Sequence, residues 1–200
     1  SSSTVSKKFI EASATKLREF QERDLREEDI VAVVLDGKTF AEETMVVALG
    51  ITISGDKRFL GFVETDTENE KVLTPFLRSL IERGLDPSQG LLVVLDGGKG
   101  LRAAAKKAFR NRALIQRCQW HKRENVVGYL PKSDQVAWRQ RLQRAYNRPT
   151  HDEASSALDQ LHAELEDRNQ SAAGSLAEGL DETLTLHRLG VYSVLGCSLK

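Results

Sequence analysis

The same five residues, Val-Val-Leu-Asp-Gly, occur twice in the chain, at 33–37 and at 93–97. Each copy is a short β-branched, apolar run that stops at a carboxylate and then at a glycine. This pattern is typical of a buried strand that carries an Asp to the end of a sheet. An Asp-Gly pair is also common in ordinary turns, so for either copy alone a simple turn remains the alternative. The 60 positions from Asp36 to Asp96 leave room for a hairpin, a crossover helix and a return strand.

The stretch that contains both copies alternates between strand and helix patterns. Short connections between the first three strands favour an antiparallel meander. Asn69 is the expected N-cap of the helix that follows, and Pro75 is expected to weaken or kink its first turns. Because a strand–helix–strand unit crosses over right-handed, the second copy is expected to run parallel to the first. The expected strands are 30–35, 44–53, 58–64, the second copy itself and a candidate fifth strand at 113–118, and the expected helices are 69–83 and 99–110.

The two ends of the chain have a helical character. Residues 1–28 are charged and predict one helix or linker. After Pro131 the sequence turns into polar helix, with Ser133 as a candidate N-cap. A capping box at 150–153 opens the next helix, and a last helix is expected at 181–189.

Charge is distributed unevenly along a chain whose formal net charge is zero. Residues 1–98 hold 12 Lys and Arg against 18 Asp and Glu, residues 99–150 hold 14 against 2, and residues 151–200 hold 3 against 9. A basic middle segment predicts a polyanionic partner. The alternative is a solvated basic face that pairs with the acidic flanks.

Composition narrows the class of protein. Hydrophobic residues make up 40% of the 200 positions, which can support a sizeable core, and no apolar run is long enough to span a membrane. The two cysteines, Cys118 and Cys197, lie far apart and give no sign of an oxidising compartment. We therefore expect a cytoplasmic protein.

Three antiparallel strands, a helix and a parallel strand, with an Asp on the first and fourth strands, form the order of a ribonuclease-H-like core. We predict an α/β fold with this mixed sheet, in which Asp36 and Asp96 lie side by side. Two adjacent carboxylates repel each other unless a cation intervenes. Mg²⁺ prefers oxygen ligands, and two such ions about 3.5–4 Å apart activate the attacking oxygen and stabilise the leaving one in phosphodiester transfer.

Longer motifs surround both aspartates, and from residue 3 to the end they resemble the bacterial insertion-sequence transposases of the mutator family, which are Asp-Asp-Glu recombinases. The most specific motif is Cys118-x-x-His121, with Gln and Arg before it and Arg-x-Asn after it. The matching stretches are 35–39, 49–52, 60–62, 96–101, 116–125, 182–189 and 198–200.

The resemblance implies that Asp36 and Asp96 are catalytic and are the first two ligands of Mg²⁺, for which Mn²⁺ may substitute. It also implies an all-helical insertion, a third carboxylate beyond Lys200 and a DNA-recognition region before residue 1, so we expect a fragment. The expected domains are a helical linker at 1–28, a catalytic core at 29–130 and a truncated helical insertion at 131–200. Glu178 and Glu182 are interpreted as solvated surface residues and not as replacements for the third carboxylate.

The partner implied by the resemblance is double-stranded DNA, both transposon ends and target. The complete protein is expected to act as at least a dimer in the bacterial cytoplasm, in association with the nucleoid. The side chains that we predict to contact DNA are Lys99, Arg117, Lys122, Arg123, Arg139, Arg141 and Arg144.

Cys118 and His121 have the spacing of half a zinc site, but no second pair stands at a suitable distance. We do not expect zinc. We expect the pair to lie near the active site, where His121 orients a catalytic group or DNA. Trp120 and Trp138 are expected to pack in the core or the insertion, with base stacking by Trp138 as the alternative.

The main hypothesis is a partial transposase whose complete form cuts the transposon end with water and then joins the freed 3′-hydroxyl to target DNA. A first rival is a catalytically inactive remnant that only binds DNA or pairs with an intact transposase. A second rival is a stand-alone ribonuclease-H-like nuclease, against which the long helical region after His121 argues.

Overall fold

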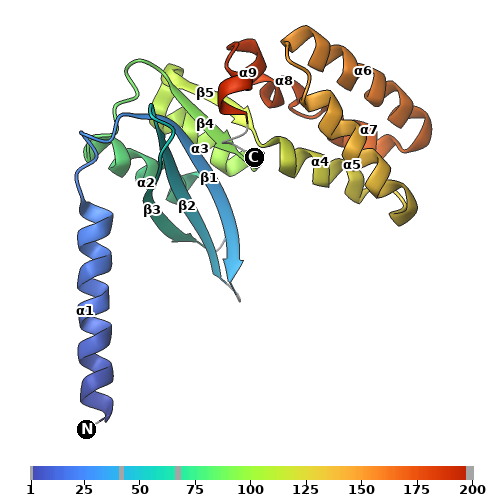
Figure 1. Cartoon of the computed structure of the whole chain (residues 1–200). Helices are drawn as coiled ribbons and strands as arrows, with labels where there is room; N and C mark the ends of the chain where they lie inside the picture. Colours follow the sequence, from blue (N-terminus) through green and yellow to red (C-terminus); the bar gives the residue numbers. More distant parts are fainter. Residues whose placement is uncertain (1, 41–42, 66–68, 197–200) are drawn as a thin grey trace.

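Five strands form one mixed sheet in the order β3-β2-β1-β4-β5 (Figure 1). The computed structural model describes residues 2–40, 43–65 and 69–196. The strands are β1 (Ile30–Phe40), β2 (Glu43–Thr52), β3 (Lys57–Thr65), β4 (Leu91–Leu95) and β5 (Ala113–Arg117). The first three strands are antiparallel, and β4 and β5 continue the sheet in parallel to β1. The predicted mixed sheet, with strands one and four as neighbours, is confirmed.

One expectation about β1 is wrong. The strand was expected to end at Leu35, but it continues through Asp36 and Gly37 to Phe40. The reason is its antiparallel partner, because β2 pairs with β1 from Asp36 onward until Phe40 faces Glu43. The parallel pairing with β4 does stop where expected, at Leu35 opposite Leu95.

Two helices cover one face of the sheet and close the main core. They are α2 (Glu70–Glu82) and α3 (Lys99–Phe109). The short helix η1 (Arg110–Arg112) connects α3 to β5. The side chain of Asn69 accepts a hydrogen bond from the Val72 amide, as expected of an N-cap. The helix continues through Pro75 to Glu82, so the proline does not end it. Leu73, Leu77 and Leu80 pack against both Val-Val-Leu runs in this core.

The opposite face of the sheet is only partly covered. Here α9 (Thr185–Arg188) and α10 (Tyr192–Leu195) place Leu186 and Tyr192 on Ala32, Leu92 and Val94. The prediction of a single helix at 181–189 is wrong, because the helix is interrupted at Leu184 and divided into α8 (Leu180–Thr183) and α9, both hydrogen-bonded to β5. The uncovered part of the face lies over β1 and β2, beside the two aspartates.

Four helices form a second core, joined to the sheet through the end of β5 (Figure 1). They are α4 (Gln119–Gly128), α5 (Lys132–Tyr146), α6 (His151–Arg168) and α7 (Gln170–Ala177). Thr150 caps α6 by accepting the Glu153 amide, as predicted. The prediction for Ser133 is wrong, because α5 begins one residue before it and its hydroxyl bonds to Asp134. Helices α4 and α7 were not expected, and the domain boundaries drawn from the sequence stay a prediction.

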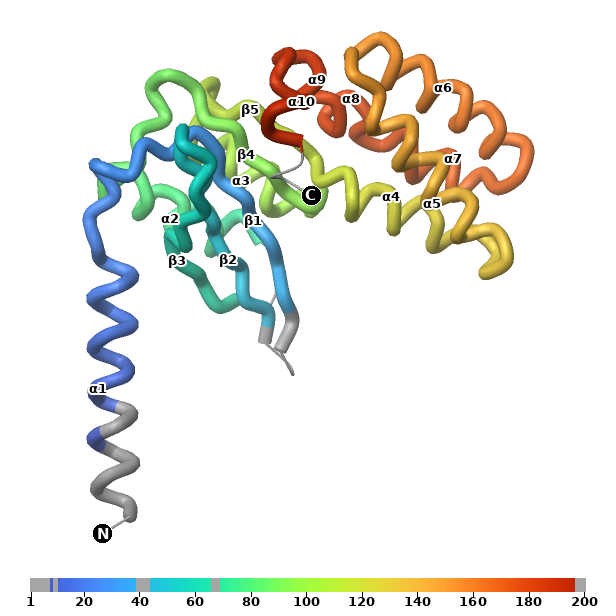
Figure 2. Tube along the Cα trace, viewed as in Figure 1, coloured from blue at the N-terminus to red at the C-terminus, as the bar shows by residue number. Residues whose placement is uncertain are grey.

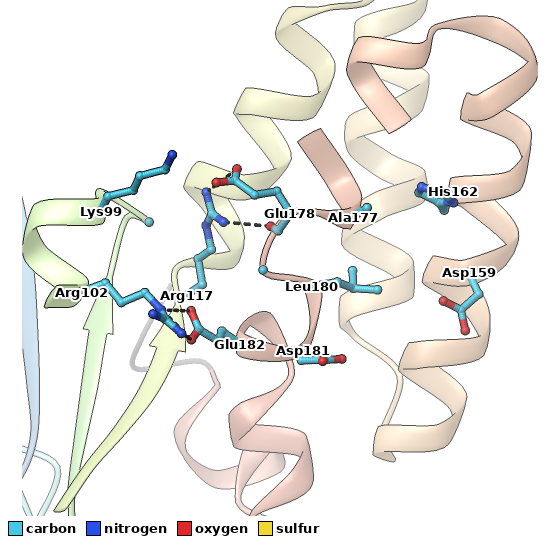
Figure 3. A pocket seen from close by; sticks show the side chains of 12 residues that line it. Lys99, Arg102, Arg117, Asp159, His162, Ala177, Glu178, Leu180, Asp181 and Glu182 are labelled. Carbon is cyan, nitrogen blue, oxygen red and sulfur yellow. Dashed lines mark hydrogen bonds and ion pairs between the residues drawn. The ribbon is translucent and has the colours of Figure 1, made fainter. Parts of the chain in front are cut away.

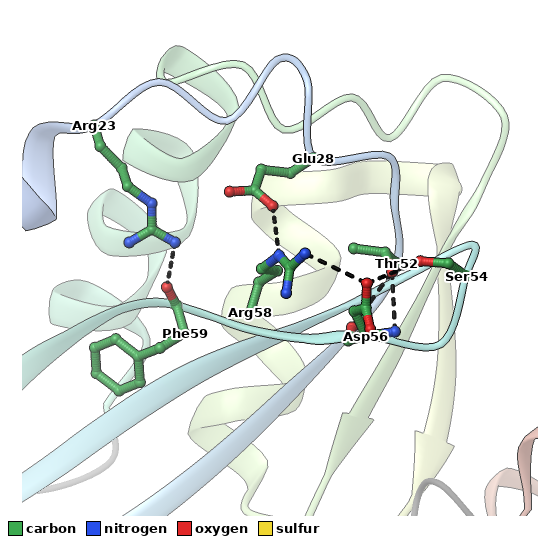
Figure 4. A network of polar contacts seen from close by, with 7 residues as sticks. All are labelled: Arg23, Glu28, Thr52, Ser54, Asp56, Arg58 and Phe59. Atoms are coloured by element: carbon green, nitrogen blue, oxygen red, sulfur yellow. Dashed lines mark hydrogen bonds and ion pairs between the residues drawn. The ribbon is translucent and has the colours of Figure 1, made fainter.

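The first helix, α1 (Ser2–Glu22), extends away from the sheet, and its residues 11–19 are exposed (Figure 2). Its end is fastened to β3. Arg23 donates to the Phe59 carbonyl at 2.6 Å, and the Phe20 and Phe59 rings lie 5.4 Å apart. Nearby, Arg58 bonds Glu28 at 3.1 Å, which ties the segment after α1 to the same strand (Figure 4).

Candidate active site

Asp36 and Asp96 lie next to each other, Asp36 within β1 and Asp96 directly after the last residue of β4. Leu35 faces Leu95 in the parallel pair, and each Asp is the next residue along its strand. Both line one pocket of about 290 Å³ whose floor is apolar sheet surface, and His121 lines it too. The neighbourhood that the sequence predicted for the two carboxylates is therefore present.

Each carboxylate is held by local contacts. An oxygen of Asp96 accepts the Gly98 amide at 2.9 Å, a bond within the turn that leaves β4. Gly97 makes this turn with φ = +105°, a conformation that favours glycine. Asp36 faces the ammonium of Lys38 at 3.2 Å. Sequence reasoning missed Lys38, although residues two apart on a strand share a face and thus signal the contact.

Cys118 and His121 enter this site from the start of α4. The Nε2 atom of His121 lies 4.0 Å from an Asp36 oxygen, and its Nδ1 atom is buried without a hydrogen-bond partner. The pKa of His121 is raised by the Cys118 side chain and by the charges of Asp36 and Asp96, against the opposing effect of burial. Burial raises the pKa of the Cys118 thiol, but the His121 side chain and backbone and the Trp120 backbone together lower it below its usual value. The pair therefore lies beside Asp36 and Asp96, and its role in an active site stays a prediction.

The donor set suits Mg²⁺ better than a soft metal. Mg²⁺ is commonly bound by one or two carboxylates, with waters and substrate phosphates completing its octahedron. Two carboxylates on one pocket wall fit that pattern. Over residues 2–40, 43–65 and 69–196, no three His, Cys, Asp or Glu side chains form a cluster that could hold a metal ion.

Glu178 and Glu182 do not join the aspartates. Glu178 is exposed, as predicted, whereas Glu182 is half-buried. Both line a separate cleft of about 780 Å³ between α3 and the helical region (Figure 3). Glu182 accepts from Arg102 at 2.7 Å, and Glu178 pairs with Arg117 at 3.2 Å. Arg117 holds the pKa of the Glu178 carboxyl below its usual range.

The predicted DNA contacts of Arg117 and Lys122 are not supported. The side chain of Arg117 is 8% exposed, and that of Lys122 is 0% exposed. Lys122 donates to the backbone carbonyls of Ser175 and Glu178. A buried cation whose hydrogen bonds go to the protein interior does not present its charge to a phosphate, so we remove both residues from the set.

The remaining predicted contacts divide into two groups. Arg123 and Arg139 both pair with Glu124, and Arg141 pairs with Glu164. Lys99 and Arg144 are exposed and form no ion pair with the residues that the structure describes.

The basic segment as a whole is half neutralised. Seven of its 14 basic residues form ion pairs within the described chain, five of them with the acidic flanks. Pairing with the acidic flanks is therefore present for part of the segment, and a polyanionic partner for the rest stays a prediction. The other seven are exposed and, among the described residues, unpaired; they are Lys99, Lys106, Arg110, Arg112, Lys132, Arg144 and Arg148.

The two tryptophans differ in their surroundings. Trp138 is 3% exposed in the helical core, with the Arg141 guanidinium 4.4 Å from its ring centroid, so the packing prediction is confirmed for it. Trp120 is 51% exposed and lines the pocket of the two carboxylates. The packing prediction is wrong for Trp120, because the first turn of α4 points it out of the core.

Known proteins resemble the chain along most of its length. The family model described as "Transposase, Mutator family" matches residues 1–193. The transposase for insertion sequence element IS256 in transposon Tn4001 of Staphylococcus aureus is 30% identical over 193 residues, covering 90% of this chain and 49% of that protein. The transposase for insertion sequence element IS905 of Lactococcus lactis subsp. lactis is 31% identical, covering 93% of this chain and 47% of its own length.

A third relative, the transposase for insertion sequence element IS6120 of Mycolicibacterium smegmatis, is 27% identical, with 86% of this chain and 54% of that protein covered. The chain spans about half the length of the relatives that it matches. None of the described helices is long and apolar enough to cross a membrane. With the family model matching nearly the whole sequence, the chain belongs to the mutator family of transposases.

Proposed function

We propose that this chain carries the first two catalytic carboxylates of a Mg²⁺-dependent DNA transposase with a ribonuclease-H-like core. The observation that carries the proposal is the parallel register of β1 and β4, which brings Asp36 and Asp96 to one pocket. The complete protein, acting as at least a dimer, hydrolyses a phosphodiester at the transposon end. It then transfers the freed 3′-hydroxyl to target DNA.

The roles of the side chains follow from their positions. Asp36 and Asp96 would hold the metal, for which Mn²⁺ may substitute. Bound Mg²⁺ supplies Lewis-acid polarisation of the phosphoryl oxygen and activation of water at neutral pH. His121, 4.0 Å from Asp36, orients that carboxylate or the attacking group. The Asp96 carboxylate is fixed in the turn by the Gly98 amide.

The DNA contacts are assigned to cations that face solvent. Lys99 stands three residues after Asp96 and is exposed, as is Arg144 at the end of α5. Backbone phosphates bound by such side chains release counterions, so binding weakens steeply with salt. The exposed ring of Trp120 lies beside the carboxylates, where an unpaired base could stack on it.

The second candidate function is a catalytically inactive chain that binds DNA or an intact transposase. The observation that favours it is that, among the described residues, no third His, Cys, Asp or Glu side chain joins the two aspartates in a cluster that could hold a metal ion. Salt-dependent DNA binding without cleavage would support this candidate. A chain with no detectable affinity for DNA at low salt would count against both functions.

The test is Mg²⁺ and Mn²⁺ binding by calorimetry on the chain and on Asp96→Asn. Asp86→Asn is the matched control, since Asp86 also accepts an amide two residues later but does not line the pocket. We expect binding that Asp96→Asn abolishes and Asp86→Asn preserves. If neither ion binds the unaltered chain, the two carboxylates do not form a site by themselves, and the inactive candidate replaces the proposal.

A further inference from the structure

Two buried cations converge on one loop of the helical region. Arg117 is the last residue of β5, and Lys122 lies in α4. A terminal nitrogen of Arg117 donates to the Glu178 carbonyl at 2.8 Å (Figure 3), and Lys122 donates to the same carbonyl at 2.5 Å and to the Ser175 carbonyl at 2.5 Å. The backbone at the end of α7 is thus hydrogen-bonded both to β5 and to α4.

The acceptors have a specific origin. Ser175 lies in the last turn of α7, and Glu178 is the C-cap of that helix. Carbonyls at a helix C-terminus lack intrahelical partners and carry the negative end of the helix dipole, so cations stabilise them. Charge-assisted hydrogen bonds to such acceptors also offset the cost of burying Lys122 and Arg117.

Arg117 also touches the turn that carries Asp96. A Cβ atom at Gly97 would lie 2.2 Å from the Nε atom of Arg117, and a Cβ atom at Gly179 would lie 2.7 Å from its Nη1 atom. Both glycines have positive φ, +105° and +66°. The guanidinium is therefore packed between the backbone of the Asp96 turn and the backbone of the loop after α7. Its Nε atom is buried without a hydrogen-bond partner, so packing fixes this edge.

We propose that Arg117 is a positioning residue, which couples the Asp96 turn to the helical region by packing between Gly97 and Gly179 while it shares the Glu178 carbonyl with Lys122. At these two positions the sequence predicted contacts with DNA, but both side chains bond to the Glu178 carbonyl instead. We call this arrangement of Arg117, Lys122 and the Glu178 carbonyl the clasp. The inference rests on the proposed function only where metal binding is the readout, and its structural content is independent of it.

The first readout is the backbone amide of Gly98, which donates to Asp96 and reports on the turn. We would follow its NMR resonance and its hydrogen exchange in Arg117→Ala and Arg117→Lys. The matched control is Arg102→Ala, which removes another Arg–Glu pair of the same cleft. We expect exchange at Gly98 to rise about tenfold or more in Arg117→Ala, because a buried charged hydrogen bond and its packing are lost. In Arg102→Ala we expect no more than about a twofold change, as for an exposed pair. Unchanged protection of the α2 amides would show that the main core persists.

A second variant separates the clasp from a surface ion pair. Glu178→Gln removes the carboxylate but keeps the carbonyl that both cations use, so we expect exchange at Gly98 to stay near that of the unaltered chain. If Arg117→Ala does not fold, Arg117→Lys and Lys122→Met provide the same comparison. The inference is overturned if the Arg117 variants leave Gly98 as protected as Arg102→Ala does, or if Glu178→Gln reproduces their effect.

Metal affinity is the functional readout. In Arg117→Ala we expect a Mn²⁺ dissociation constant raised about tenfold relative to Arg102→Ala, with Arg117→Lys between them, since local opening of the turn lowers the population competent to bind. If the unaltered chain binds no Mn²⁺, the proposed function fails while the Gly98 amide still decides the clasp. Equal Mn²⁺ affinity in both Ala variants, with the amide effect present, would show that the clasp orders the turn without positioning Asp96.

Discussion

Replacing Gln116 by Met should lower the free energy of unfolding, because Gln116 binds residues 183–186 to the sheet. Gln116 is 2% exposed on β5. Its amide nitrogen donates to the carbonyls of Thr183 at 2.8 Å and Arg117 at 2.7 Å, and its oxygen accepts the Leu186 amide at 2.9 Å. Met has a similar length and no polar atoms, so packing is nearly kept while three hydrogen bonds are lost.

The expected loss of unfolding free energy is about 4 kcal/mol, from roughly 1 kcal/mol for each of the three bonds and about 1 kcal/mol for burying the Leu186 amide unpaired. The Thr183 carbonyl keeps a bond from Gln119, which places the estimate below the sum of three full penalties. Since Leu186 packs on the partly covered face of the sheet, loss of its anchor also exposes that face.

Urea unfolding followed by circular dichroism measures this change, provided that the transition is two-state with an unchanged slope. Gln119→Met is the control, because Gln119 gives a single bond to the Thr183 carbonyl and should cost about 1 kcal/mol. A loss below about 0.5 kcal/mol in Gln116→Met, the range of ordinary surface changes, would refute the reasoning.

Three further predictions use other parts of the structure. Arg144→Ala should reduce the magnitude of the slope of log affinity for duplex DNA against log salt by about 0.9, the value for one phosphate contact. Arg123→Ala should leave this slope unchanged, and equal slopes in both variants would show that Arg144 does not contact DNA. Burial lowers the pKa of Lys122 from 10.5 to about 8, so the unfolded chain binds the extra proton between these values and stability should rise with pH across them; Lys122→Met should flatten that rise in urea titrations. In Trp138→Phe, where Trp120 is the remaining indole, single-stranded DNA should quench the emission of Trp120, and unquenched emission despite DNA binding would exclude stacking.

Local pattern was sufficient for the elements that form the two aspartate positions. A β-branched apolar run before Asp-Gly predicts a buried strand, and both copies form one; a turn follows only the second copy, because β2 continues to pair with β1 beyond Gly37. The helix between the copies has one apolar face with Asn69 at its start. The right-handed crossover predicts only that β4 runs parallel to β1. That the two strands are neighbours, so that Asp36 and Asp96 meet, was expected from the ribonuclease-H-like strand order. The sequence motifs also predicted the family of the chain correctly.

The course of the chain outside these elements could not be predicted in the same way. Whether β1 ends at Leu35 depends on how far β2 accompanies it, which is a property of the pair. Helix α4 contains the Cys-x-x-His block, whose polar residues conceal the apolar positions Val126 and Val127 that face the second core. Because most residues of α4 are polar, its few apolar positions give only a weak helical pattern in the sequence.

The basic residues of the middle segment show most clearly which properties can be predicted from sequence and which depend on the fold. The order of residues is enough to show that the middle of the chain is basic and that Arg and Lys stand next to the Cys-x-x-His block. Which of these cations face solvent depends on distant segments. Arg117 and Lys122 are buried against the end of α7 and the residue after it, 53 or more positions later in the chain. A cation near the active site can bind a phosphate or the end of a helix, and sequence-local chemistry is the same in both cases. The packing of α7 against α4 made that choice.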